Sequence, residues 1–289
     1  MKKSILIIAA VVVTAIINFS AVVKPESQAR TIVNKMIKAI DTHNGCMYTM
    51  RSMERINGMK ELRGGDIFTK INVSPHKAYM KMVTDPNKGT EILYVEGERN
   101  NKALVNPGKW LPTITLDPMS SLLTKDQHHI LLTAGFSLIS KIVGDAVKKA
   151  DDQGKFDIVF KYAGDVSWNN RNCYKLVIED PTWTYTTYVA KKGENMYTVS
   201  SKLLIPEYSM VELDGVKNFE ENLGGKTLKV PTSYAKKTIF YIDKETNFPI
   251  YQECSDDKGV FEHYEFYNLV VNPAYKADEF TKGFDGYKF

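Results

Sequence analysis

Tyr188-Val-Ala-Lys-Lys-Gly-Glu-Asn-Met-Tyr-Thr-Val-Ser-Ser-Lys-Leu-Leu-Ile-Pro206 begins the most informative stretch of this chain. A short strand leads into a turn made of one glycine and two polar residues. Apolar side chains at Met196, Val199 and Leu203 then recur at the spacing of one helical face. Pro206 lacks the backbone N–H that a helix interior needs, so we expect the helix to end before it.

The residues that follow complete a small unit. Ser209-Met-Val-Glu-Leu-Asp-Gly215 predicts a second short helix that stops at its glycine, and Thr227-Leu-Lys-Val230 predicts a closing strand. The order strand, helix, helix, strand and the ending Gly225-Lys-Thr-Leu-Lys-Val-Pro231 resemble a LysM module. In other proteins that module binds the N-acetylglucosamine backbone of peptidoglycan or chitin, so the resemblance implies peptidoglycan as a partner.

The LysM resemblance also implies where a glycan would bind. In such modules the sugar lies between the loop after the first strand and the loop after the second helix. The matching residues here are the glycan-binding candidates: Gly193, Glu194, Asn195, Met196, Leu213, Asp214, Gly215 and Val216. The usual Asp-Thr after the glycine is replaced by Glu194-Asn195 in this chain. The alternative is therefore a unit that keeps the LysM fold and acts as a spacer or a protein contact.

The N-terminus predicts export. Two lysines precede an apolar run, Ser4–Ile17, whose length is typical of a signal peptide and short for a membrane-spanning helix. Ser27-Gln-Ala29 places small residues three and one before a cleavage site, which predicts a signal peptide over residues 1–29. An uncleaved anchor is the alternative, because Phe19–Val23 partly extends the apolar run. We expect a periplasmic or otherwise exported protein.

The composition is that of a folded chain. Its 289 residues are 43% hydrophobic with a net charge of +4, enough for one large domain and a small one. No basic cluster alternates with aromatic residues, so no nucleic-acid partner is expected. The three cysteines Cys46, Cys173 and Cys254 fit buried apolar positions on strands, and a disulfide between two of them stays open.

Most of the remaining chain predicts strands. One helical face spans Ile32–Ile40, and Met119–Ala150 is expected to be helical, with Gly135 as the point at which the helix can divide. The expected strands, bounded by turn residues, are 46–56, 67–73, 77–83, 91–96, 156–162, 172–179, 184–190, 236–242, 249–255 and 260–271. Strands 184–190 and 236–242 are expected to be neighbours in a meander, with the small unit projecting from their connection.

The order of elements resembles the outer-membrane lipoprotein carrier fold, the LolA/LolB-like half-barrel. Tyr241-Ile-Asp-Lys-Glu-Thr-Asn-Phe-Pro-Ile-Tyr-Gln-Glu253 matches the strand-turn-Pro-strand hairpin of that superfamily. Tyr267-Asn-Leu-Val-Val-Asn-Pro-Ala-Tyr-Lys-Ala-Asp-Glu-Phe280 matches its last strand and the Asp-x-Phe that follows. The chain is similar to a family of exported bacterial proteins that combine this half-barrel with a LysM-like insert.

This resemblance implies an α+β fold. An antiparallel LolA-like half-barrel sheet covered by helices would be formed by residues 30–189 and 232–289, with a βααβ LysM-like insert at 190–231. Its cavity would accept a lipid or a lipoprotein acyl chain, since each buried methylene contributes roughly 0.8 kcal/mol. The candidate lining residues are Phe68, Tyr79, Met82, Tyr94, Leu132 and Phe136. The alternative is a filled half-barrel that serves as a scaffold of the cell envelope.

Catalytic and metal-binding motifs are weak, so we expect a non-enzymatic protein without cofactor or metal. The sequence has no Gly-x-Ser-x-Gly and no His-Glu-x-x-His. His128-His129 falls in an expected helix, where adjacent side chains point about 100° apart and do not easily share a metal. Cys254 and His263 are a weak nucleophile–base pair because no third group orients them. The sequence leaves the lipid and the oligomeric state open.

Overall fold

The computed structural model describes residues 26–289 except residue 109. The apolar run of the predicted signal peptide lies outside the described residues. No helix in the described part of the chain is both long enough and apolar enough to cross a membrane.

Helix α1 (Gln28–Thr42) begins inside the segment predicted to be cleaved. The Ser27 side chain accepts a hydrogen bond from the Arg30 backbone N–H at the start of the helix, and Ala29 is buried. Cleavage after Ala29 would remove this N-cap and part of the first turn. Ile32, Val33, Met36 and Ile40 form the buried face of α1, as their spacing predicts.

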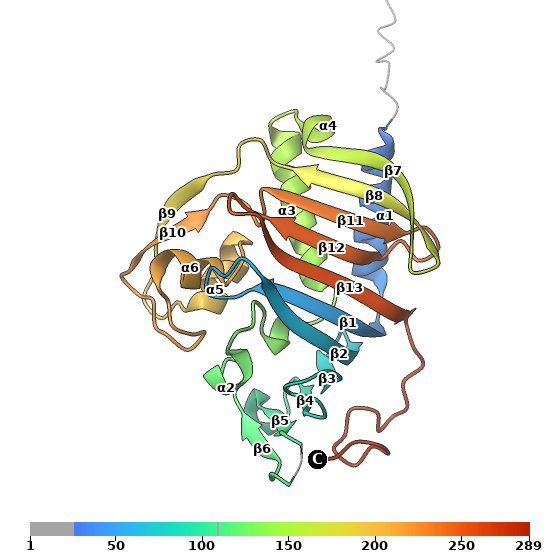
Figure 1. Ribbon diagram of the computed structural model, residues 1–289, viewed down its shortest axis with the longest axis vertical. Helices are drawn as coiled ribbons and strands as arrows, with labels where there is room; N and C mark the ends of the chain where they lie inside the picture. Colours follow the sequence, from blue (N-terminus) through green and yellow to red (C-terminus); the bar gives the residue numbers. More distant parts are fainter. Residues whose placement is uncertain (1–25, 109) are drawn as a thin grey trace, which may run out of the picture.

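Among the described residues, eleven strands form one antiparallel sheet in the order β6-β5-β4-β3-β2-β1-β13-β12-β11-β8-β7 (Figure 1). The strands are β1 (Gly45–Arg55), β2 (Leu62–Asn72), β3 (Lys77–Met82), β4 (Glu91–Val95), β5 (Ala103–Asn106), β6 (Ile114–Leu116), β7 (Phe160–Trp168), β8 (Arg171–Glu179), β11 (Lys237–Asp243), β12 (Pro249–Ser255) and β13 (Val260–Val271). The predicted α+β fold with a large open antiparallel sheet is confirmed.

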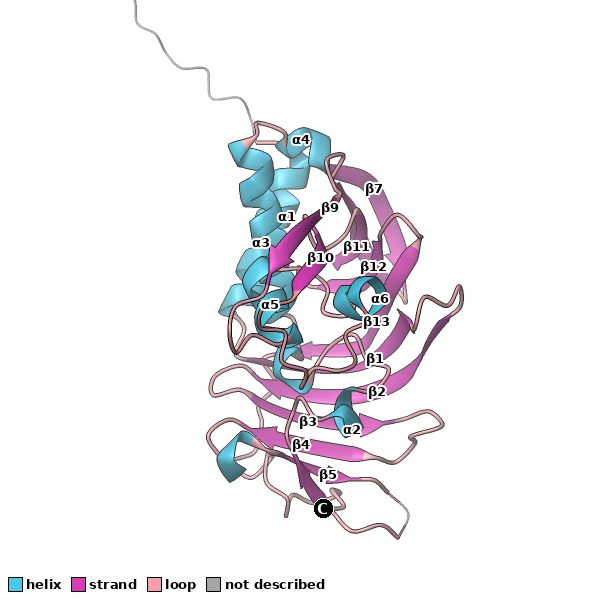
Figure 2. Ribbon diagram, turned by 90° about the vertical axis from the view of Figure 1, so that its left-hand side faces the viewer, coloured by secondary structure: helices cyan, strands magenta, loops and turns pink. Residues whose placement is uncertain are grey.

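Helices cover one face of this sheet (Figure 2). They include α1, α2 (Ser121–Thr124), α3 (Ser137–Asp152) and α4 (Phe156–Val159), with the short 3-10 turn η2 (Leu131–Thr133). Another 3-10 turn, η1 (Arg99–Asn101), connects β4 to β5. The main hydrophobic core lies between α1, α3 and the sheet.

The helix expected over Met119–Ala150 forms only in part, as α2, η2 and α3, and the chain divides at Gly135 as expected. Gly135 has a φ of +97° and separates η2 from α3. That left-handed conformation ends any regular helix at this point. The strand expected at 156–162 is likewise replaced in its first half by α4, and β7 starts at Phe160.

A second, two-stranded sheet lies apart from the large one. It joins β9 (Tyr185–Val189) to β10 (Thr227–Pro231), with α5 (Met196–Leu203) and α6 (Ser209–Asp214) between them. The predicted order strand, helix, helix, strand is therefore present, and Gly215 ends α6 with a φ of +67°. We call residues 185–231 the βααβ unit. Its core is formed by side chains such as Met196, Val199, Met210, Phe219 and Leu228.

One predicted pairing is wrong. β9 pairs with β10 and not with β11, whereas β11 pairs with β8 and β12. Strand 184–190 thus belongs to the βααβ unit instead of the large sheet. The three cysteines are buried and free, which fits their reading as apolar strand residues.

Candidate functional site

A cavity of about 440 Å³ lies between the helix-covered face of the sheet and the irregular segment before α3. A second cavity, of about 330 Å³, lies between α3 and strands β8, β11 and β12. Four residues line both: Ile139, Ile142, Tyr234 and Gln252. Volumes of this size are typical of sites for small molecules. We call them the large cavity and the small cavity.

Strand alternation decides which side chains line the large cavity. Met82 pairs with Ile67 and Met80 pairs with Thr69 across β2 and β3, and all four line it. Their neighbours along each strand point to the opposite face. Met82 is therefore the predicted lining residue that the structure places at this cavity.

The prediction that Phe68 and Tyr79 line the cavity is wrong. They lie on the opposite face of the sheet, in a cluster with Phe280 and Tyr287 of the C-terminal segment. The Tyr79 and Tyr287 rings stack with centroids 3.7 Å apart. Tyr79 and Met82 are three residues apart on one strand, so they cannot share a face.

The other three predicted lining residues belong to packed regions and line neither cavity. Phe136 is fully buried and meets the Tyr48 ring at 5.6 Å between centroids. Tyr94 is buried in the main core, with its ring 5.8 Å from that of His76. Leu132 packs between the main core and the core of the βααβ unit.

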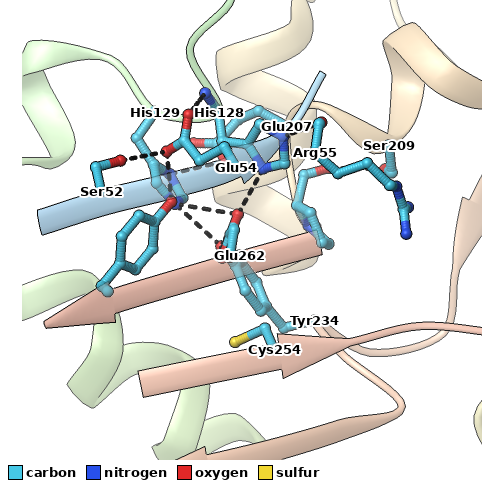
Figure 3. A network of polar contacts seen from close by, with 12 residues as sticks. Ser52, Glu54, Arg55, His128, His129, Glu207, Ser209, Tyr234, Cys254 and Glu262 are labelled. Carbon is cyan, nitrogen blue, oxygen red and sulfur yellow. Dashed lines mark hydrogen bonds and ion pairs between the residues drawn. The ribbon is translucent and has the colours of Figure 1, made fainter. Parts of the chain in front are cut away.

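A buried polar network forms part of the wall of the large cavity (Figure 3). Glu262, on β13, has no exposed surface. It accepts a hydrogen bond from the Tyr234 hydroxyl at 2.9 Å, and its Oε1 lies 3.0 Å from His128 Nδ1. The same oxygen lies 3.4 Å from His129 Nε2. Two adjacent histidines thus meet one carboxylate.

Glu54, near the end of β1, is the second carboxylate of the network. It accepts hydrogen bonds from the Tyr264 hydroxyl at 2.6 Å and from the His128 backbone N–H at 3.0 Å. Ser52 donates to it at 3.3 Å. The His128 ring is fixed from its other side, since Nε2 lies 2.8 Å from the backbone carbonyl of Arg55.

These contacts shift the pKa values of the network. Burial is the largest influence on His129 and lowers its pKa, but Glu207 and Glu262 outweigh it and hold the pKa well above 6.5. Burial likewise raises the pKa of Glu262, and the two histidines outweigh it, so its pKa falls below 4.5. Burial and Glu262 raise the pKa of Tyr234 far above 10. The network therefore holds a charged His–Glu arrangement at neutral pH.

The network continues into the βααβ unit. His129 Nδ1 lies 3.2 Å from Glu207 Oε2, in the turn before α6. The Arg55 guanidinium contacts Glu212 of α6 at 2.8 Å and Asp256 at 2.5 Å, and none of the three side chains is more than 12% exposed. These contacts dock the unit onto the large sheet.

The prediction that His128 and His129 lie in a helix is wrong. The two residues lie in a non-helical segment between α2 and η2, so both rings reach Glu262. Among residues 26–108 and 110–289, no group of three or more His, Cys, Asp or Glu side chains is arranged to hold a metal ion. The His-His pair alone was the signal in the sequence, and its three glutamate partners are distant along the chain.

The pair Cys254 and His263 does not form. Cys254 is opposite Glu262 and His263 is opposite Glu253 in the β12–β13 register, so their side chains lie on opposite faces. Burial and Glu262 raise the pKa of the Cys254 thiol, which keeps it protonated.

The glycan-binding candidates have structural contacts within the βααβ unit. Met196 and Val216 are buried in its core. The Asn195 side chain caps α5, and Glu194 accepts hydrogen bonds from Tyr188 and from the Lys191 backbone N–H.

The remaining glycan-binding candidates lie at turns and beside β10. Asp214 accepts a hydrogen bond from the Lys229 backbone N–H at 2.9 Å. Leu213 lines a pocket of about 30 Å³ beside Arg55. Gly193 and Gly215 have positive φ angles at the two turns.

Comparisons with known proteins give one family match. A family model described as "Protein of unknown function (DUF1571)" matches residues 43–210. No curated protein matches the sequence.

Several solved structures align with the chain at low identity. MucB is 11% identical with a TM-score of 0.44, and the alignment covers 90% of this chain but 64% of MucB, less than two thirds of its length. Lipoprotein LppX of Mycobacterium tuberculosis is 10% identical with a TM-score of 0.41, covering 86% of this chain and 97% of LppX. LprF of Mycobacterium bovis is 11% identical with a TM-score of 0.40, covering 86% and 97%.

Proposed function

This chain belongs to the DUF1571 family, and we propose that it is an exported, non-enzymatic protein of the cell envelope that holds a lipid acyl chain in the large cavity. The open volume of about 440 Å³ is the observation that carries this proposal. A filled half-barrel acting only as a scaffold would leave no such space. Apolar side chains such as Met80, Met82 and Ile92 line much of the cavity, and their contact with an acyl chain is favourable by roughly 0.8 kcal/mol per buried methylene.

The polar network supports a binding role over a catalytic one. A general base needs a pKa near the working pH and access to a substrate proton. Glu262 and His129 instead hold each other in the charged state, with pKa values moved away from neutrality in opposite directions. Glu262 also accepts a hydrogen bond from the Tyr234 hydroxyl, which occupies an oxygen that a substrate proton would need.

A contact with peptidoglycan through the βααβ unit is the second part of the proposal. The unit has the predicted order of elements, and its turns at Gly193 and Gly215 have the backbone conformation that favours glycine. The glycan would lie against the loops 193–196 and 213–216.

Binding of a fluorescent fatty acid to the purified protein tests the acyl-chain proposal. We expect saturable binding at micromolar concentration, and we expect Ala134→Trp to abolish it, because Ala134 lines the large cavity and the indole would fill the space. Ile158→Trp is the matched control, since Ile158 is 54% exposed on α4 and lines neither cavity. Absence of saturable binding to the parent protein would favour the scaffold.

A further inference from the structure

Gln252 stands where the large and small cavities meet. It lies on β12, is 6% exposed and lines both cavities. Its Nε2 donates to Cys254 Sγ at 3.4 Å, whereas its Oε1 is buried and has no hydrogen-bond partner. A buried amide oxygen without a donor is unfavourable, and most such groups in proteins are paired.

The neighbouring hydroxyl donors are already in use. The Tyr234 hydroxyl donates to Glu262, and the Tyr264 hydroxyl donates to Glu54. The His129 ring faces the carboxylates of Glu207 and Glu262, although its Nδ1 makes no aligned hydrogen bond. Near Gln252 the carboxylates of Glu54 and Glu262 already have their own partners, and the Gln252 oxygen is a free acceptor, so an uncharged hydrogen-bond donor fits this point better than an anionic headgroup.

At its exposed side, the large cavity offers a positive charge instead of carboxylates. Lys125 lines that cavity and is exposed. A ligand with an acidic end is best placed with that end beside Lys125 and its chain directed inward. The group that reaches Gln252 must then be uncharged and must donate a hydrogen bond.

We propose that the ligand carries a hydroxyl or amide N–H part-way along its acyl chain, and that Gln252 Oε1 accepts a hydrogen bond from it where the two cavities meet. This inference rests on the proposed acyl-chain function and names the ligand class: a hydroxylated or amide-linked acyl chain. A plain saturated chain would leave the Gln252 oxygen without a partner.

Competition against the fluorescent fatty acid tests the inference. The competitors are stearic acid, a series of hydroxystearic acids with the hydroxyl at successive positions, and the corresponding oxostearic acids. We expect at least one hydroxystearic acid to bind about two- to tenfold more tightly than stearic acid, the range that one net hydrogen bond gives. The matching oxo acid, which has no donor, should bind no more tightly than stearic acid.

Variants locate the effect at Gln252. Gln252→Leu should remove the preference for the hydroxyl while keeping the affinity for stearic acid, and Gln252→Met provides a second variant of similar volume. Both should unfold at a temperature no lower than the parent, because they remove an unpartnered acceptor. Gln28→Leu, on the exposed surface of α1, is the matched control and should keep the preference.

The outcomes separate the two proposals. If all fatty acids bind the parent equally, or if the hydroxyl preference survives in Gln252→Leu, the inference is wrong while the acyl-binding function stands. Tighter binding of the oxo acid would also overturn it, since the amide would then present its N–H. If no fatty acid binds the parent, the proposed function itself fails.

Discussion

His129 Nδ1 lies 3.2 Å from Glu207 Oε2, which joins the segment before α3 to the turn between α5 and α6. Glu207 is 3% exposed, so the contact is screened little by water. Because the two residues belong to the wall of the cavity and to the βααβ unit, the same network that borders the proposed ligand site also docks the unit.

Removing Glu207 should destabilise the protein. Glu207→Ala removes one of the two carboxylates beside the charged His129 ring, which is 24% exposed and keeps Glu262, so we expect a loss of about 1–3 kcal/mol, less than for a fully buried pair. Urea unfolding measures the change. Glu245→Ala is the control, because the Glu245 side chain is 80% exposed beside Arg171 and its removal should change the free energy of unfolding by less than about 1 kcal/mol. Equal effects of both changes would contradict the docking role.

Stability should depend on pH in a defined direction. The pKa of His129 is raised in the folded protein, so its contribution is complete below 6.5 and is lost as the pH rises through the folded value. The pKa of Glu262 is lowered, so its contribution is complete above 4.5 and is lost as the pH falls toward about 2. The free energy of unfolding should therefore decline as the pH rises above 6.5, and His129→Gln should flatten that decline. An unchanged slope in the variant would exclude His129 as its source.

Arg55 should hold the βααβ unit against the large sheet through its two carboxylate partners. Arg55→Met leaves Glu212 and Asp256 without their shared guanidinium, and we expect faster hydrogen exchange in α6 and β10, because the unit loses its docking contact. Arg55→Lys should restore part of the protection, since a lysine keeps the charge but not the forked geometry. Exchange that rises equally in β1 and α6 would indicate global unfolding instead.

The glycan proposal predicts sedimentation of the purified protein with peptidoglycan. Gly215→Val should weaken it, because Gly215 has a φ of +67° and a β-branched residue is strained there. Gly144→Ala is the control, since that glycine lies in α3, has no positive φ and has open space around its Cβ position. If the parent protein remains in the supernatant at every salt concentration, the unit does not anchor the protein to peptidoglycan.

Local sequence patterns predict much of this fold. Alternation and turn residues locate β1, β3, β4 and β12 closely, since each lies in a simple antiparallel hairpin. Pro206 and Gly215 mark the ends of the helices in the βααβ unit for reasons that are local to the backbone. The pairing of β9 was missed because alternation identifies a strand but not its partner.

The site was harder to predict than the fold. Phe68 and Tyr79 look like cavity residues because the C-terminal segment gives the outer face of the sheet a hydrophobic cluster of its own. His128 and His129 reach Glu262 only because the chain around them is irregular, and no short-range pattern indicates that. Gln252 alternates like any inward residue of β12, and only the packing around it shows that its oxygen lacks a donor.

Native mass spectrometry of the protein purified from its own cell envelope tests the central claim most directly. The acyl-chain proposal predicts a mass above that of the polypeptide, lost on denaturation and identified as a molecule with an acyl chain. The same preparation of Ala134→Trp should lack this added mass, because the indole occupies the large cavity. Parent protein that shows only the bare polypeptide mass, under both native and denaturing conditions, would contradict the claim.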